Sequence, residues 1–156
     1  MDGTRQPAER TQGRVLGLDV GSKRIGVAIS DELGITAQGL ETLQRKNKKA
    51  DFAALDLLIR QHHVREIVIG LPLRLSGAEG MQSEKMRHFA EELRVRTRLP
   101  VHLFDERLTS AEANRVLRES NISISKRAAA VDRMAAVLIL QAWMEAQISL
   151  RESEES

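Results

Sequence analysis

The sequence contains no cysteine and no tyrosine, and aromatic residues make up only 3% of its 156 positions. Without cysteine, the chain cannot form disulfides or thiolate metal sites, which is compatible with a reducing cytoplasm. The shortage of aromatic rings argues against a single-strand binding protein that stacks bases on a ring platform. No run of 18 apolar residues is present, and the polar first fourteen residues lack the apolar segment of a signal peptide. We therefore expect a cytoplasmic protein with no membrane contact.

The composition that is present is typical of a globular protein, with 42% hydrophobic and 29% charged residues and a formal charge of +2. This weakly basic balance permits a nucleic-acid partner without requiring one. The basic residues gather in three groups, although such runs are usually solvated faces. The groups are Arg45, Lys46, Lys48 and Lys49; Arg94, Arg96 and Arg98; and Arg115, Arg118, Lys126 and Arg127.

The order of the expected elements indicates an α/β fold. Apolar and β-branched runs predict strands at 15–20, 25–30, 35–43, 66–72 and 101–104, and helical spacing predicts helices at 50–63, 81–97, 109–119 and 126–149. The first three strands read as an antiparallel meander, and the last two alternate with helices. We therefore expect a five-stranded mixed sheet flanked by helices in one domain, residues 14–150. A flexible tail, residues 1–13, precedes it, and an acidic tail, residues 151–156, follows.

Asp19 closes the first apolar strand, where a carboxylate is costly unless something pairs with it. Glycines on both sides leave the backbone open to a phosphate or to another strand. Lys23 and Arg24 then place positive charge beside the acid. This arrangement suits a metal-and-phosphate site, and the alternative is that Asp19 only shapes the turn.

Glu106 and Asp132 are two further acids at conspicuous positions. Glu106 follows the last predicted strand, and sites in such sheets lie beyond the carboxyl ends of the strands. Asp132 lies in an almost wholly apolar helix, on the core-facing stripe that also carries Ile139 and Trp143. An ionised Asp132 there requires a cation. Alternatively, Asp132 lies in the first turn of its helix and interacts with the helix dipole.

Asp19, Glu106 and Asp132 together offer the hard oxygen ligands that Mg²⁺ or Mn²⁺ prefers. Two such ions about 3.5–4 Å apart can activate water and stabilise the leaving oxygen in phosphodiester cleavage. Arg107 could hold a phosphate or only pair with Glu106, and Thr109 could contact a phosphate or only cap its helix. The residues expected to bind substrate are Lys23, Arg24, Arg74, Arg107 and Thr109.

Four short motifs stand out: Gly17-Leu18-Asp19-Val20-Gly21, Ile69-Gly70-Leu71-Pro72, Asp105-Glu106-Arg107-Leu108-Thr109 and Val131-Asp132-Arg133-Met134-Ala135-Ala136. Together, and in this order over residues 14–146, they resemble the YqgF/RuvX family. The resemblance implies an RNase H-like fold. It also implies a metal-dependent nuclease, acting either in 5′-end processing of pre-16S rRNA or as a Holliday junction resolvase on branched DNA. The family's acids fall on Asp19, Glu106 and Asp132.

In this interpretation Asp19 bridges two Mg²⁺ or Mn²⁺ ions, Glu106 and Asp132 complete the ligand set, and water is the nucleophile. RNase H-like nucleases often use a fourth carboxylate, for which Asp105 is the nearest candidate. Strand alternation, however, points Asp105 away from the side of Glu106. The expected partners are pre-rRNA or branched DNA, with a ribosomal subunit as a further candidate. A monomer suffices for processing a single strand, whereas symmetric junction cleavage requires a homodimer.

Two other functions compete with the nuclease. Residues 19–23 also look like the first phosphate loop of actin and sugar-kinase folds, which would make the chain a phosphotransferase. Those folds need a second domain and another glycine-rich loop, for which 156 residues leave no room. The basic groups alone would suit a non-catalytic, RNA-binding ribosome-assembly factor that needs no metal.

Overall fold

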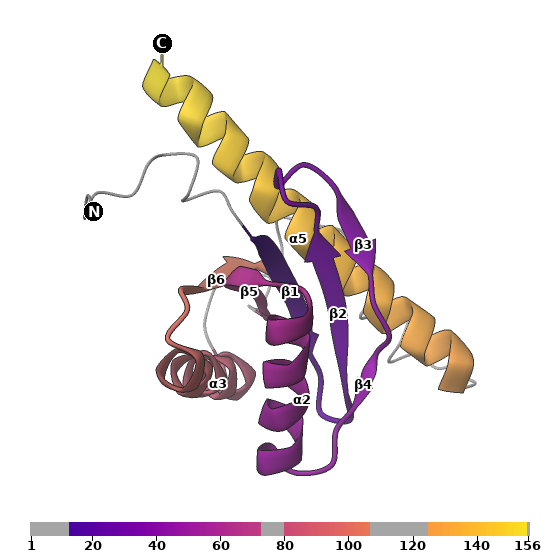
Figure 1. The fold of residues 1–156 in the computed structure, drawn as a ribbon. Coiled ribbons are helices and arrows are strands. Elements are labelled where there is room, and N and C mark those ends of the chain that lie inside the picture. The colour runs from indigo at the N-terminus through magenta and orange to yellow at the C-terminus, as the bar shows by residue number, and fades with distance from the viewer. Residues whose placement is uncertain (1–12, 73–79, 107–124, 156) are drawn as a thin grey trace.

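The computed structural model of the chain describes residues 13–72, 80–106 and 125–155. Its elements, labelled as in Figure 1, are β1 (Arg14–Val20), β2 (Arg24–Ser30), β3 (Ala37–Gly39), β4 (Leu43–Gln44), α2 (Lys48–Gln61), β5 (Val64–Leu71), α3 (Met81–Thr97), β6 (Val101–Asp105) and α5 (Ser125–Glu155). The helix expected at 109–119 lies outside the described residues.

The strands form one mixed sheet in the order β3-β2-β1-β5-β6, and the short β4 also pairs with β2. β1 is antiparallel to β2 and parallel to β5, and β5 is parallel to β6. This confirms the predicted meander followed by parallel strands. β1, β5 and β6 are therefore parallel neighbours, and their carboxyl ends share one edge of the sheet. Asp19 lies near the end of β1, residues 73–79 come after β5, and Glu106 directly follows β6.

The third strand differs from the prediction, because it consists of two short pieces rather than one strand over 35–43. β3 and β4 both pair with β2, but they are separated by residues 40–42. Arg133 of α5 donates from Nε to the Leu40 carbonyl oxygen at 2.9 Å. The Leu40 N–H still donates to the Val27 carbonyl of β2, but the Leu40 carbonyl bonds this side chain from the distant helix, and regular pairing resumes only at Leu43.

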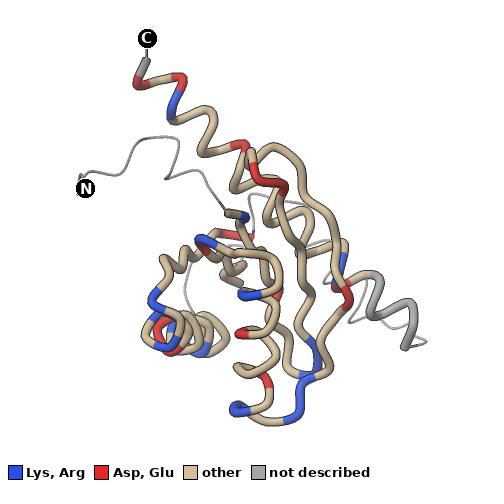
Figure 2. Tube along the Cα trace, in the orientation of Figure 1, with Lys and Arg blue, Asp and Glu red and all other residues tan. Residues whose placement is uncertain are grey.

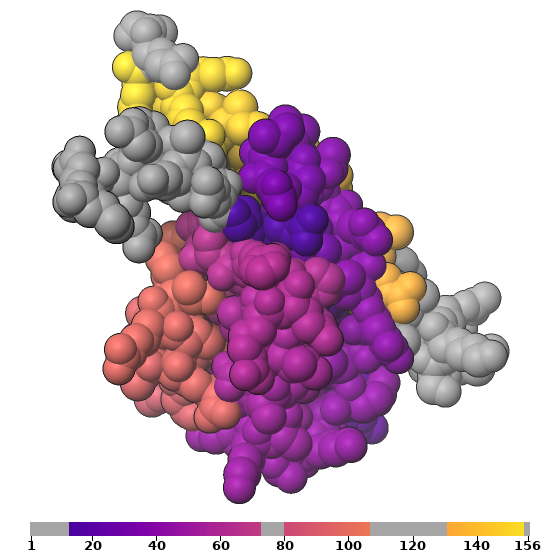
Figure 3. All heavy atoms as spheres, viewed as in Figure 1, coloured from indigo at the N-terminus to yellow at the C-terminus, as the bar shows by residue number. Residues whose placement is uncertain are grey.

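Helices cover both faces of the sheet. α2 and α3 lie side by side on one face (Figures 1 and 3), and α5 crosses the other (Figure 1). Side chains of β1 alternate between the two layers. Leu16 and Leu18 belong to the core cluster beneath α2 and α3, whereas Val15 packs with the residues of α5. Residues of β1 with odd numbers therefore face α5.

α2 begins two residues earlier than predicted because Asn47 caps it, accepting a hydrogen bond from the Ala50 N–H at 2.8 Å. It ends at the cap residue His62, and His63 adopts a left-handed φ of 53°. α5 continues to Glu155, beyond its expected end near residue 149, so Glu152 and Glu154 lie on an exposed helical turn and not on a separate tail. None of the helices in the described ranges has the length and apolarity to cross a membrane.

Candidate active site

Asp19 is the sixth residue of β1 and is fully buried. Its partner across the antiparallel pair with β2 is Gly26. On the other side, the parallel register with β5 runs to Leu18 and Ile69, and Gly70 is the next residue of β5. Odd-numbered residues of β1 face α5, so Asp19 lies on the α5 side of the sheet with a glycine on each neighbouring strand.

The glycine at position 70 leaves the space in which the Glu106 carboxylate lies. A Cβ atom added to Gly70 would be 2.6 Å from Oε1 of Glu106 and 2.6 Å from Cδ1 of Ile139 in α5. Glu106 directly follows β6 and is fully buried. Phe104 packs with the α5 residues, so Glu106 falls on that face by alternation and Asp105 falls on the opposite one. This agrees with the expectation that argued against Asp105 as a fourth site carboxylate.

The glycine at position 26 allows α5 to approach the sheet closely at Asp132. A Cβ atom there would be 2.1 Å from the main-chain oxygen of Asp132, a contact that no other residue could accommodate without moving the helix. The side chain of Asp132 is 1% exposed, and its Oδ2 accepts a hydrogen bond from Nε of Arg24 at 2.6 Å. Asp132 is the eighth residue of α5, so the alternative that it serves in the first helical turn is wrong. Arg24 is the cation that its burial requires.

The three acids thus occupy one end of the sheet face that α5 covers. Asp19 lies on the central strand, Asp132 lies over Gly26 on one side of it, and Glu106 lies over Gly70 on the other. All three are buried, and each has a polar or electrostatic partner. Among residues 13–72, 80–106 and 131–154, however, no three His, Asp or Glu side chains are grouped closely enough to hold one metal ion together. The arrangement is a concentration of buried oxygen ligands rather than a preformed cage.

The predicted substrate-binding residues have different positions. Lys23 is exposed in the turn between β1 and β2. Arg24, the first residue of β2, donates to Asp132, 108 positions along the chain. Arg74, Arg107 and Thr109 lie outside the described residues.

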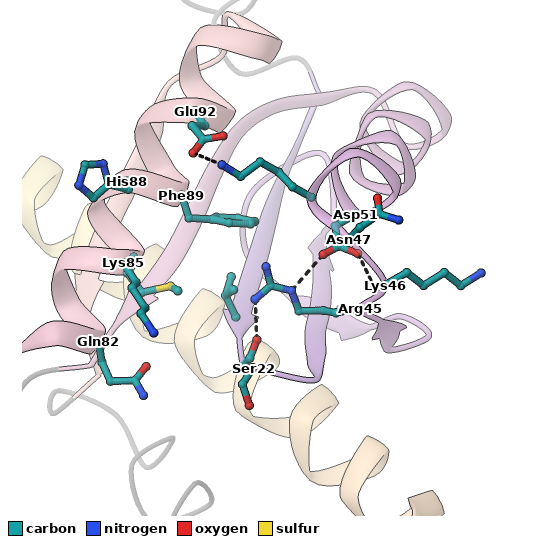
Figure 4. A pocket seen from close by; sticks show the side chains of 14 residues that line it. Ser22, Arg45, Lys46, Asn47, Asp51, Gln82, Lys85, His88, Phe89 and Glu92 are labelled. Atoms are coloured by element: carbon teal, nitrogen blue, oxygen red, sulfur yellow. Dashed lines mark hydrogen bonds and ion pairs between the residues drawn. The ribbon is translucent and has the colours of Figure 1, made fainter.

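Arg45 is a positioning residue that the sequence did not single out from its basic group. Its Nη1 donates to the Gly21 carbonyl at 2.8 Å, and its Nε donates to Oδ2 of Asp51 in α2 at 3.1 Å (Figure 4). Its guanidinium also lies 5.7 Å from the ring centre of Phe89 in α3. Arg45 therefore holds the turn after Asp19 against both helices, through partners that no local sequence pattern connects.

A second polar group lies at the other end of the same sheet face. His102 Nε2 is 3.0 Å from Oε2 of Glu66, and the imidazole stacks on Trp143 of α5 with ring centres 5.1 Å apart. The hydrogen bond from His102 holds the pKa of Glu66 below its ordinary value, against the opposing effect of burial. This group fixes the second half of α5 to β5 and β6.

Solved structures share this fold. Thermus thermophilus RuvC in complex with a Holliday junction superimposes with a TM-score of 0.53 and 11% identity, over 88% of this chain and 96% of that one. A second structure of Thermus thermophilus RuvC gives a TM-score of 0.52 over 87% and 96%. These neighbours show that the chain has an RNase H-like fold.

Sequence relatives are closer. Proteins named "Putative pre-16S rRNA nuclease" are 64% identical in Koribacter versatilis, over 85% of this chain and 87% of that protein, and 51% identical in Moorella thermoacetica, over 85% and 94%. Residues 13–146 match the family described as "RuvX: Holliday junction resolvase". The chain belongs to the RuvX family, which confirms the resemblance seen in the four motifs.

Proposed function

We propose that this protein is a metal-dependent nuclease that hydrolyses phosphodiester bonds in 5′-end processing of pre-16S rRNA, in the cytoplasm. The observation that carries the proposal is the burial of Asp19, Glu106 and Asp132 at the carboxyl end of three adjacent strands. Three buried carboxylates at one edge bring oxygen donors together, and catalytic sites occupy this position in open α/β sheets. The choice of pre-16S rRNA follows the names of the relatives.

The donor set fits Mg²⁺ or Mn²⁺ in kind, since it consists of carboxylate oxygens. Asp19, Glu106 and Asp132 would hold the ions, because all three are buried at the same end of the sheet face that α5 covers. When bound, the ions supply an activated water and stabilise charge on the phosphate.

The protein's own residues would prepare this chemistry. Arg24 fixes the orientation of the Asp132 carboxylate through its short hydrogen bond. The packing of α5 over Gly26 excludes water from one side of Asp19. Lys23, exposed on the turn, is placed to attract the phosphate backbone of an approaching strand.

A cleavage assay tests the proposal. Wild type, Asp19→Asn, Asp132→Asn and the matched control Asp105→Asn are each incubated with Mg²⁺, Mn²⁺ or Ca²⁺ and three substrates: a precursor rRNA leader, a single-stranded RNA and a four-way DNA junction. We expect the first two variants to lose cleavage and Asp105→Asn to keep it, since its side chain alternates onto the other face of the sheet. Cleavage by Asp19→Asn at nearly the wild-type rate would refute the assignment.

The substrate arms separate the alternatives. Preference for the four-way junction, with a homodimer in solution, would replace rRNA processing by junction resolution. Binding of the rRNA leader without cleavage by any protein would favour a non-catalytic assembly factor that associates with a ribosomal subunit. A readout independent of activity is the unfolding midpoint, which Mn²⁺ should raise in wild type more than in Asp19→Asn.

A further inference from the structure

A groove of about 550 Å³ lies on the sheet face opposite the three acids but at the same edge. Its walls come from the first turn of α2, from the N-terminal half of α3, and from the turn that follows Asp19 (Figure 4). The residues of that turn, Gly21 and Ser22, line the groove, while Arg24, two positions later, contacts Asp132. The groove and the acids are therefore separated only by the thickness of the β1–β2 hairpin.

The charge in the groove is positive once its internal pairs are counted. Both lining carboxylates already have cations: Asp51 pairs with Arg45, and Glu92 pairs with Lys48 at 2.8 Å. Lys85 of α3 also lines the groove and forms no ion pair with any other residue in the described part of the chain. Figure 2 shows further Lys and Arg gathered where the chain enters α2, whose N-terminus adds partial positive charge.

The donors in the groove suit phosphate oxygens rather than bases. Gln82 lines the groove on α3 with Lys85, and Ser22 lines it from the hairpin, and both side chains are neutral donors (Figure 4). The aromatic ring in the wall, Phe89, is only 8% exposed and already faces Phe52 and Arg45, so a base cannot stack on it. A ligand held here is recognised through its backbone charge.

The shape of the groove gives the ligand a direction. The ion pair between Lys48 and Glu92 joins α2 to α3 across one end, whereas Ser22 and Gln82 stand at the other end (Figure 4). A nucleic-acid strand that enters the groove at Ser22 would first pass the β1–β2 hairpin, which carries Asp19. Arg45 donates to the Gly21 carbonyl and so fixes the position of this hairpin relative to the groove.

We propose that this groove binds backbone phosphates of the nucleic-acid strand on one side of the scissile bond, with Lys85 as its main cationic contact and Ser22 and Gln82 as neutral donors. The proposal rests on the nuclease function proposed above, and it adds a binding site on the face that carries none of the three acids. Affinity gained here would position the scissile phosphate across the hairpin at Asp19.

The test measures binding of a fluorescently labelled 20-nucleotide single-stranded RNA in EDTA, so that cleavage does not interfere. Lys85→Gln is compared with wild type and with Lys49→Gln. The second variant removes an exposed charge at the N-terminal end of α2, next to the groove but outside its lining. For one lost contact with single-stranded RNA, the slope of log K against log salt should fall by about 0.7 in Lys85→Gln. It should not change in Lys49→Gln. In cleavage assays, Lys85→Gln should raise KM and leave kcat unchanged.

The proposal would be overturned if Lys85→Gln kept the wild-type slope, or if Lys85→Gln and Lys49→Gln lowered the slope equally. Either result would mean that the groove makes no specific contact with the RNA. Because binding is measured without cleavage, the two proposals fail separately. If Lys85→Gln has the wild-type slope and the wild-type protein cleaves RNA, only the groove proposal is refuted. A reduced slope in a protein that cleaves nothing refutes the nuclease and leaves the groove as a site for RNA.

Discussion

Gly70→Ala would add one methyl group at the point where β5 faces the Glu106 carboxylate. The new Cβ atom would lie 2.6 Å from Oε1 of Glu106, whereas an ordinary contact begins near 3.4 Å, so the carboxylate must retreat by about 0.8 Å. Both atoms closest to the methyl group are the ends of side chains, Oε1 of Glu106 and Cδ1 of Ile139. The loss of stability should therefore be near the low end of overpacking costs, about 1–2 kcal/mol.

The effect on activity should be much larger than the effect on stability. A catalytic group displaced by about 1 Å can cost about 100-fold in rate, so we expect single-turnover cleavage by Gly70→Ala to fall roughly that far. Urea unfolding of the same variant separates a loss of rate from a loss of the fold. A folded Gly70→Ala protein with a wild-type rate would refute the placement of Glu106 in the site.

Two further predictions concern charged pairs. Arg24→Ala leaves the buried Asp132 without its guanidinium partner. Because Arg24 is itself partly exposed, the free energy of unfolding in urea should fall by about 3 kcal/mol, whereas Lys23→Ala should lower it by less than about 0.5 kcal/mol. Equal stability of the two variants would contradict the pairing. The lowered pKa of Glu66 means that its ionised form stabilises the fold above the ordinary pKa of a glutamate and that this contribution is lost as pH falls through the lowered value. The stability gap between wild type and Glu66→Gln, followed by the fluorescence of Trp143, should therefore be present at neutral pH and close in acid; a gap independent of pH would show that the hydrogen bond to His102 has no such effect.

Asp19 and Asp132 could be singled out from the sequence because each interrupts an apolar pattern, and Glu106 could be singled out by its position after a predicted strand. Asp19 lies between the buried Leu18 and Val20 near the end of β1, and Asp132 occupies a stripe with Ile139 and Trp143, both of which are buried in the structure. A charge at a core-facing position is rare enough to be informative on its own. The parallel order of the strands then followed from the alternation of helices and strands.

Features that depend on distant partners could not be predicted in this way. The partner of Arg24 lies 108 positions away, and the interruption between β3 and β4 involves Arg133 of a helix that follows much later in the chain. The end of α5 was placed too early because its last residues are polar. Glu and Arg are nevertheless good helix formers, and a helix already anchored on the sheet extends through them at little cost.

The length of α5 has a mechanical consequence. Its 31 residues reach about 46 Å, whereas the five strands it crosses span about 20 Å, so the helix overhangs the sheet. It bears on the sheet at Asp132, over Gly26, and again at Trp143, on His102. Between these two points the helix packs continuously on the sheet through Ala135, Ala136, Ile139 and Leu140, so these contacts hold it as one unit. The spacing between Asp132 and Asp19 is therefore governed by the seating of the whole helix as much as by either side chain.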